Sequence, residues 1–364
     1  MSAAGAAFSA IDHAHMARAL RLAERGLYTT QPNPRVGCVI AHGAEIVGEG
    51  WHERAGEAHA EVFALRDAGA RAREATAYVT LEPCGLHGRT PPCADALIAA
   101  GVARVVIAAE DAFQREGGAI ERMRAAGIIV ESGLMREASR ELNRGFFSRV
   151  ERGRPWVRIK LAMSLDGRTA LANGESKWIT GEAAREDVQR WRARSSAILT
   201  GSGTVLADDP RLTLRLNSAH AAPLRVVLDR GLRTPRSAHV LDGSVPTLIF
   251  HAAGAKSAHD DFGQVELAAI DIHDGRLDLL QVLQELGRRG VNELQVEAGP
   301  TLCGALLQSG FVDELLLYTA PVVLGDKARP LLGAPDLAQM AQAKRLHAVD
   351  RREIGGDTRI LYRE

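Results

Sequence analysis

The sequence lacks several features that would assign it to a functional class at once. Its 45 basic residues are balanced by 45 acidic residues, so no net charge draws it to nucleic acid or to an anionic membrane. No apolar run approaches the ~20 residues of a membrane span, and the amino terminus has no basic start or hydrophobic core of a signal peptide. Four cysteines in 364 residues are too few for a disulfide framework. We therefore expect a cytoplasmic enzyme.

Two of the cysteines belong to a pattern that predicts a metal site. His59 and Glu61 are followed by Cys84 and Cys93, and a proline stands directly before each cysteine. Imidazole and thiolate are preferred zinc ligands, and a catalytic zinc keeps its fourth position for water, whose pKa it lowers to about 7. In zinc-dependent nucleobase deaminases, a glutamate two residues after the histidine moves the proton. The pattern predicts His59, Cys84 and Cys93 as ligands and Glu61 as the proton shuttle.

Each part of this pattern has a simpler interpretation when it stands alone. A single His-x-Glu is usually a solvated helix face, and a single buried cysteine is usually a small core residue. The cysteines are also eight residues apart, where the deaminase signature has two. The order of the parts and the prolines favour the metal site, whereas Cys38 and Cys303 lack such neighbours and are expected to be core thiols. A binding module with a structural zinc is the alternative, although such sites are closed by four protein ligands.

Helical and strand patterns alternate along the whole chain. This alternation predicts α/β domains with helices on both faces of a sheet, and the charged, proline- and glycine-containing segment 151–155 predicts a boundary between domains 1–150 and 151–364. In the first domain we expect helices at 12–25, 59–69, 92–101, 117–126 and 135–150, and strands at 36–41, 45–48, 77–81, 104–108 and 128–131. In the second we expect helices at 181–194, 277–289 and 301–309, and strands at 155–167, 196–200, 224–229, 246–250, 293–297, 312–319 and 359–363.

The second domain has no Gly-x-Gly-x-x-Gly fingerprint, so the sequence does not support a Rossmann dinucleotide site. Its best local signal is an apolar strand that runs into Gly299-Pro300-Thr301 and then into a helix. Free amides at such a helix start can hold a phosphate, although this turn is usually structural when it stands alone. A second glycine cluster at 201–204 is equally well interpreted as a plain loop.

Longer motifs connect these separate signals. They are PNPRVG at 32–37, GEAHAE at 56–61, EPC with GRTPPC, KLAMSLDGRTA, GESKWIT, ILTGSGTVLADDPRLT and VEAGPTLCGALL. Together they resemble the bifunctional deaminase–reductase family of riboflavin biosynthesis over nearly the whole chain. The resemblance implies an amino-terminal, cytidine-deaminase-like three-layer α/β/α domain and a carboxyl-terminal α/β domain similar to dihydrofolate reductase.

The resemblance implies two consecutive reactions. Zinc-dependent hydrolysis would remove the 2-amino group of 2,5-diamino-6-ribosylamino-4(3H)-pyrimidinone 5′-phosphate. NADPH would then reduce the ribosyl side chain to ribityl, giving 5-amino-6-(5-phosphoribitylamino)uracil. The alternative is a zinc deaminase acting on another base, nucleoside or tRNA, but a tRNA enzyme is expected to carry a basic surface. No nucleic acid or membrane partner is expected, and although family members often self-associate, nothing in the sequence fixes the oligomeric state.

The resemblance also assigns substrate and cofactor contacts. Arginines among them suit a phosphate because a guanidinium binds oxyanions bidentately, and Arg230 would contact the 2′-phosphate of NADP. Where the family commonly has Ser-His or Asn-His after the first zinc cysteine, this chain has Gly85-Leu86, with His87 and Arg89 beyond. The implied substrate contacts are Asn33 and His52 in the deaminase domain and Lys160, Ser176, Arg192, Leu212, Arg215 and Glu297 in the reductase domain. The implied cofactor contacts are Ala162, Trp178, Thr204, Asp208, Arg230, Gly299, Pro300, Thr301, Leu302, Cys303, Gly304 and Ala305.

Overall fold

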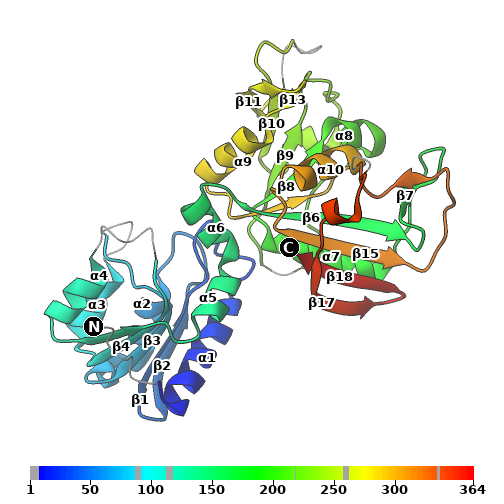
Figure 1. Cartoon of the computed structure of the whole chain (residues 1–364). Helices are drawn as coiled ribbons and strands as arrows, with labels where there is room; N and C mark the ends of the chain where they lie inside the picture. Colours follow the sequence, from blue (N-terminus) through cyan, green and yellow to red (C-terminus); the bar gives the residue numbers. More distant parts are fainter. Residues whose placement is uncertain (1–7, 87–91, 112–117, 218, 257–261, 334–336) are drawn as a thin grey trace. The chain divides into compact units, whose positions relative to one another are not determined.

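The computed structural model divides the chain into two compact units, Met1–Arg152 and Gly153–Glu364 (Figure 1). It describes residues 8–86, 92–111, 118–217, 219–256, 262–333 and 337–364. None of the described helices is long and apolar enough to span a membrane.

The first unit is built on a five-stranded mixed sheet. β1 pairs antiparallel with β2 and β3, whereas β4 and β5 continue parallel to β3. All five strands were predicted from their apolar runs, and their bounds differ from the expected ones by a few residues. In sheet order they are β2 (Glu45–Trp51), β1 (Gly37–His42), β3 (Thr76–Leu81), β4 (Arg104–Ala109) and β5 (Ile129–Ser132).

Helices cover both faces of this sheet, as predicted. Ile40 packs in a cluster with residues of α2, α3 and α4, whereas its neighbour Val39 packs with α1, because successive strand residues point to opposite faces. Figure 1 shows the resulting three layers. The helices are α1 (Ala10–Glu24), α2 (Ala60–Ala68), α3 (Cys93–Ala100), α4 (Ala119–Ala125), α5 (Arg136–Leu142) and α6 (Arg144–Arg152), with a short 3₁₀ turn η1 (Gly69–Ala72) after α2.

The helix predicted over 135–150 is two helices, α5 and α6, with Asn143 between them. The Asn143 side chain accepts a hydrogen bond from the Arg35 backbone N–H at 2.8 Å and donates one to the Arg35 carbonyl at 2.9 Å. Asparagine side chains compete with the helical hydrogen-bond pattern when they bind backbone groups. The contact with Arg35, distant in sequence, therefore accounts for the break.

The second unit contains a nine-stranded sheet. Seven neighbouring strands, β11, β10, β9, β8, β14, β6 and β15 in sheet order, run parallel to one another. β18 and β17 are added antiparallel at the edge next to β15. β11 and β17 were not predicted. In sheet order the strands are β11 (Glu266–Ile270), β10 (Thr247–Ala252), β9 (Leu224–Leu228), β8 (Ala197–Gly201), β14 (Glu293–Val296), β6 (Trp156–Ser164), β15 (Glu314–Ala320), β18 (Asp357–Arg363) and β17 (His347–Ile354).

Helices again lie on both faces. Residues of α9 (Leu279–Arg288) and α10 (Pro300–Gln308) share one apolar cluster with the sheet, and α7 (Glu182–Arg194) and α8 (Ser202–Asp208) contribute to clusters on the other face. The glycine cluster at 201–204, for which a loop was one interpretation, begins α8. The remaining elements are the two-stranded pairs β7 (Arg168–Ala170) with β16 (Arg329–Pro330) and β12 (Ile272–His273) with β13 (Arg276–Leu277), and the 3₁₀ turns η3 (His239–Leu241) and η4 (Met340–Gln342).

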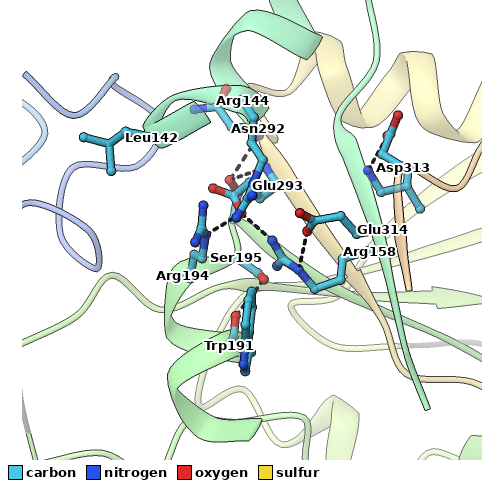
Figure 2. Close-up of polar contacts among 12 residues, drawn as sticks. Leu142, Arg144, Arg158, Trp191, Arg194, Ser195, Asn292, Glu293, Asp313 and Glu314 are labelled. Carbon is cyan, nitrogen blue, oxygen red and sulfur yellow. Dashed lines mark hydrogen bonds and ion pairs between the residues drawn. The ribbon is translucent and has the colours of Figure 1, made fainter. Parts of the chain in front are cut away.

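A buried ion-pair cluster fixes the end of α7 to the sheet (Figure 2). The fully buried Arg158 donates to Glu293 at 2.8 Å and to Glu314 at 2.9 Å, and Arg194 of α7 donates to Glu293 at 2.8 Å. The Arg158 guanidinium also lies 4.6 Å from the centre of the Trp191 ring. Removing one partner of such a buried pair typically costs about 3–5 kcal/mol, so this cluster gives α7 a rigid attachment.

Candidate active sites in the two units

The three predicted metal ligands converge in the first unit. His59 is the residue that caps the start of α2, rather than a residue of its first turn as predicted, and Cys93 is the first residue of α3. Cys84 follows the end of β3, so a strand end and two helix starts deliver the three side chains. Their ligand atoms all lie within 4.8 Å of one another. Sequence reasoning therefore brought together side chains that the fold also brings together.

The geometry and chemistry of this cluster fit zinc. His59 Nδ1 lies 3.2 Å from Cys93 Sγ and 3.5 Å from Cys84 Sγ. Zn–N and Zn–S bonds of about 2.0 and 2.3 Å in a tetrahedron would place nitrogen and sulfur about 3.5 Å apart. The Cys93 thiol, together with His59 and the Cys93 backbone N–H, lowers the pKa of Cys84 to about 4, which favours the thiolate. Cys93 then keeps its own proton because it donates to Cys84, and a metal would displace that proton.

Glu61 lies beside the cluster in the first turn of α2. Only 3% of the residue is exposed, and burial raises its pKa to about 6. Its Oε2 atom is buried and has no hydrogen-bond partner among the residues that the structure describes. A buried carboxyl group with one uncommitted oxygen can accept a proton and release it, which is what a general acid–base group requires.

The predicted substrate contacts Asn33 and His52 form a pair next to the metal ligands. His52 Nδ1 lies 3.0 Å from the Ala58 carbonyl oxygen, which can only accept, so this nitrogen carries the proton. His52 Nε2 then accepts from Asn33 Nδ2 at 3.0 Å, and burial lowers the pKa of His52, so the ring stays neutral. The imidazole thereby fixes the Asn33 amide and leaves its Oδ1 as an acceptor. The rings of His52 and His59 lie 5.4 Å apart, edge to face.

The family-divergent positions after Cys84 are only partly described. The Gly85 carbonyl accepts a hydrogen bond from Arg122 Nη1 at 2.9 Å, and Leu86 is 48% exposed. His87 and Arg89, which would supply the imidazole and the cation in this segment, lie outside the described residues.

The second unit contains a cleft of about 1500 Å³. It lies where β6, β14 and the starts of α8 and α10 meet, which is the usual place for a ligand in an open α/β sheet, outside the carboxyl ends of the strands. Most residues that the resemblance assigned to this domain line it. They are Lys160, Ala162, Ser176, Trp178, Thr204, Asp208, Arg230, Glu297, Gly299, Pro300, Thr301, Leu302 and Ala305.

Glu297 lines this cleft and is bound by Arg192, a further predicted contact that does not itself line it. Arg192 Nε and Nη2 each donate to the Glu297 carboxylate at 2.7 Å, and Nη1 donates to the Thr213 carbonyl at 3.0 Å. Burial alone would raise the pKa of Glu297, but the Arg192 guanidinium outweighs burial and holds that pKa at about 2. Burial lowers the pKa of the neighbouring Lys160, whose Nζ lies 5.7 Å from the centre of the Tyr318 ring. The cleft therefore has a fixed carboxylate and, in Lys160, an amino group without a hydrogen-bonded carboxylate among the described residues.

Four other predicted contacts do not line the cleft. Leu212 is buried in an apolar cluster and has a positive φ of 49°. Arg215 is exposed, and its backbone N–H donates to Gln189 Oε1 at 3.1 Å. Cys303 is fully buried and donates to the Ala298 carbonyl, and a Cβ atom on Gly304 would lie 2.3 Å from the Gly333 oxygen. For these four residues, as for Arg192, contact with a ligand stays a prediction.

Several cleft residues were missed by sequence reasoning. Arg185 places its guanidinium 4.7 Å from the centre of the exposed Trp178 ring, and Arg233 donates to Ser202 at 3.0 Å. His273 and Arg276, from the β12–β13 hairpin, also line the cleft. Arg185 could have been found from its place in the first turn of the helix that follows GESKWIT. The hairpin has no apolar run, so no signal indicated it.

The cleft fits a dinucleotide phosphate cofactor. Gly299 caps α10, and Pro300 is its first residue, so the free amides of the first turn lie at the cleft. A Cβ atom on Gly299 or Gly203 would meet no atom of the described residues within 4 Å, which leaves room for a ligand beside the backbone. Arg230 and Arg233 supply positive charge at the same cleft. These groups suit an elongated anionic ligand.

Known proteins resemble both units. The family model of the cytidine and deoxycytidylate deaminase zinc-binding region matches residues 9–109, and that of the RibD C-terminal domain matches residues 155–359. Riboflavin biosynthesis protein RibD of Escherichia coli (strain K12) is 49% identical over 359 residues, 95% of this chain and 97% of the relative. Form 1 of Acinetobacter baumannii RibD has a TM-score of 0.90 at 43% identity, with 97% of this chain and 98% of that chain covered. A diaminohydroxyphosphoribosylaminopyrimidine deaminase/5-amino-6-(5-phosphoribosylamino)uracil reductase from Thermotoga maritima has a TM-score of 0.87 at 32% identity, with the same coverage.

Proposed function

Since the chain belongs to the RibD family of riboflavin biosynthesis, with a zinc-binding deaminase region and an NADPH-dependent reductase domain, we propose how its residues divide the two reactions. Residues 1–150 carry the deaminase and residues 151–364 the reductase. The substrate is the diaminopyrimidine ribosyl phosphate, and the product of the first site is the substrate of the second. We place the enzyme in the cytoplasm, a reducing compartment, which the four free cysteines support.

In the deaminase site, His59, Cys84 and Cys93 hold the zinc. When bound, the metal supplies a water nucleophile at neutral pH by lowering its pKa to about 7. Glu61 takes a proton from the attacking water and delivers it to the departing 2-amino group, for which its buried, uncommitted Oε2 is suited.

Asn33 orients the pyrimidine in the same site. Its Nδ2 is bound to His52, so its Oδ1 is the atom that accepts a hydrogen bond from the base. His52 acts on the substrate through Asn33, because both of its ring nitrogens already have protein partners.

In the reductase site, Glu297 and Lys160 contact the sugar that receives the hydride. Arg192 and Arg215 grip the 5′-phosphate. Arg192 can do so while it binds Glu297, because a guanidinium has five N–H groups and three are engaged here. Ser176 and the backbone near Leu212 complete the substrate side, and Ala162, Trp178, Thr204, Asp208, Arg230 and residues 299–305 hold NADPH.

The single observation that carries this proposal is the convergence of His59, Cys84 and Cys93 beside the buried Glu61. One assay tests it on the purified, zinc-replete protein. The diaminopyrimidine ribosyl phosphate is supplied with NADPH, and ammonia release and NADPH oxidation are followed together. We expect both, with oxidation lagging ammonia. Ammonia release without NADPH oxidation would refute the reductase assignment. The absence of both signals would favour a deaminase that acts on another base.

A further inference from the structure

One strand of the reductase unit carries a polar side chain at every second position although the strand is wholly buried. β14 contains Glu293, Leu294, Gln295 and Val296, all four buried, and Glu297 follows. Leu294 and Val296 belong to the apolar cluster that includes α9 and α10. Because alternate strand residues share a face, Glu293, Gln295 and Glu297 point to the opposite face. That face is covered by α7, whose Arg194 and Arg192 bind Glu293 and Glu297, respectively.

Gln295 lies in the middle of this polar row and binds one end of it, Glu297. Its Nε2 donates to Glu297 Oε1 at 2.8 Å, the same oxygen that accepts from Arg192 Nε. Arg192 Nη2 holds the other carboxylate oxygen at 2.7 Å. Three N–H groups from two side chains therefore fix the Glu297 carboxylate at the wall of the cleft.

The other end of the Gln295 amide has no comparable contact. Gln295 Oε1 is buried and has no hydrogen-bond partner among the described residues, and a buried unpaired acceptor destabilises a fold. Turning the amide over would place that oxygen against the Glu297 carboxylate, so the orientation is fixed by Glu297. The residue opposite Gln295 in register on β6 is Arg158, whose Nη1 is likewise buried without a partner.

We propose that Gln295 is a positioning residue of the reductase site, which holds the Glu297 carboxylate in the orientation that binds the sugar of the substrate. Arg192 holds both oxygens of the Glu297 carboxylate, but the carboxylate could still tilt about the line that joins these two oxygens. The hydrogen bond from the Gln295 amide prevents this tilt. The inference rests on the proposed role of Glu297 as a substrate contact. It adds a residue that touches neither substrate nor cofactor but sets the affinity for the substrate.

The test is Gln295→Leu in the full-length, zinc-loaded protein, with NADPH as cofactor and the deaminated ribosylaminouracil phosphate as substrate. We expect the KM for this substrate to rise roughly ten-fold with kcat retained, because the lost hydrogen bond supports the bound substrate and the transition state equally. Thermal unfolding should show that the variant is fully folded at the assay temperature. NADPH binding, measured by fluorescence titration, and ammonia release from the diaminopyrimidine should not change. Gln295→Met is the second variant of similar size, should Gln295→Leu fold poorly.

Two controls separate positioning from a general loss of structure. Gln281→Leu removes a glutamine that accepts a hydrogen bond from the Asp271 backbone at 2.8 Å on α9, away from Glu297, and should leave the KM unchanged. In a Glu297→Gln background, Gln295→Leu should have little further effect, because neighbours that act through one another are not additive. A merely structural role would lower the maximal rate through loss of folded protein and would be additive.

The outcomes distinguish this inference from the proposal beneath it. If Glu297→Gln reduces the substrate as well as the unmodified enzyme does, the role of Glu297 is wrong. If Glu297→Gln is impaired but Gln295→Leu and Gln295→Met keep an unchanged KM, Glu297 keeps its role and the positioning role of Gln295 is refuted. A raised KM in either folded variant, absent when Glu297 is already replaced, supports it.

Discussion

Replacing Glu61 with glutamine tests the deaminase assignment most directly. The change keeps the size and shape of a side chain that is 3% exposed and removes only its capacity to carry a proton. His59, Cys84 and Cys93 are untouched, so the variant should bind one zinc per chain. We expect deamination to fall and metal content to stay constant.

The size of the loss follows from what surrounds Glu61. A positioned acid–base group contributes roughly 10²–10⁴-fold, which corresponds to about 2.7–5.4 kcal/mol of barrier at 1.36 kcal/mol for each factor of ten. His52, a nearby titratable group, cannot take over, because Nδ1 is bound to the Ala58 carbonyl and Nε2 to Asn33. We therefore expect a loss at the upper end of this range, on the order of 10⁴-fold.

The assay is ammonia release at saturating diaminopyrimidine substrate, with zinc measured on the same sample. Glu57→Gln is the matched control, since Glu57 belongs to the same GEAHAE segment, is exposed and undergoes the same chemical change. NADPH oxidation with the deaminated substrate should be normal in both variants. Near-normal ammonia release by zinc-loaded Glu61→Gln would refute the role of Glu61 as the proton carrier.

Three further predictions concern the metal and the reductase cleft. Removing zinc with a chelator should abolish ammonia release but spare NADPH oxidation with the deaminated substrate; loss of both would contradict the separate sites. Arg192→Ala should impair reduction by about 10²-fold or more, since it removes a phosphate contact and leaves Glu297 buried and unpaired, whereas ammonia release should persist; unchanged reduction would count against Arg192. The pKa of Glu297 is about 2, below its ordinary value of 4.5. Its ionised form therefore stabilises the folded state above pH 4.5, and this contribution should be lost as the pH falls toward 2. Acid unfolding followed by circular dichroism should become less steep over this interval in Glu297→Gln, and an unchanged slope would contradict the ion pair.

The metal site could be predicted from the sequence because its chemistry is local to short motifs. His59 and Glu61 lie two residues apart, and each cysteine follows a proline at a turn or a helix start. The residue types and the local structure therefore both predicted a metal site without knowledge of any tertiary contact. The elements that escaped prediction depend on distant contacts. α8 begins in a glycine cluster and is held by Val205, which packs against strand residues Ile198 and Val227. β17 was missed because its sequence, HAVDRREI, is charged, which is common at a sheet edge that must not pair further.

The sequence predicted which residues serve the reductase site, but not how these residues contact one another. The family resemblance named Arg192 and Glu297 separately, and they are 105 residues apart in the sequence. Nothing in either motif indicates that they bind each other, because that contact depends on where α7 crosses the sheet. Arg215 and Leu212 were named in the same way, yet the structure places neither at the cleft wall.

The segment Leu294-Gln-Val-Glu297 shows why a polar residue can be buried without a visible signal. Alternation of apolar and polar residues is typical of a strand with one face in water, and that interpretation would place Gln295 and Glu297 in solvent. Here α7 covers the polar face and supplies the cations that it needs, Arg192 for Glu297 and Arg194 for Glu293. The burial of charge on this strand is thus decided by the partner helix, which supplies two of its arginines to it. The arrangement keeps the Glu297 carboxylate ionised inside the protein, at the edge of the cleft, and in a fixed orientation. A carboxylate exposed to solvent would also be ionised, but it would be free to rotate.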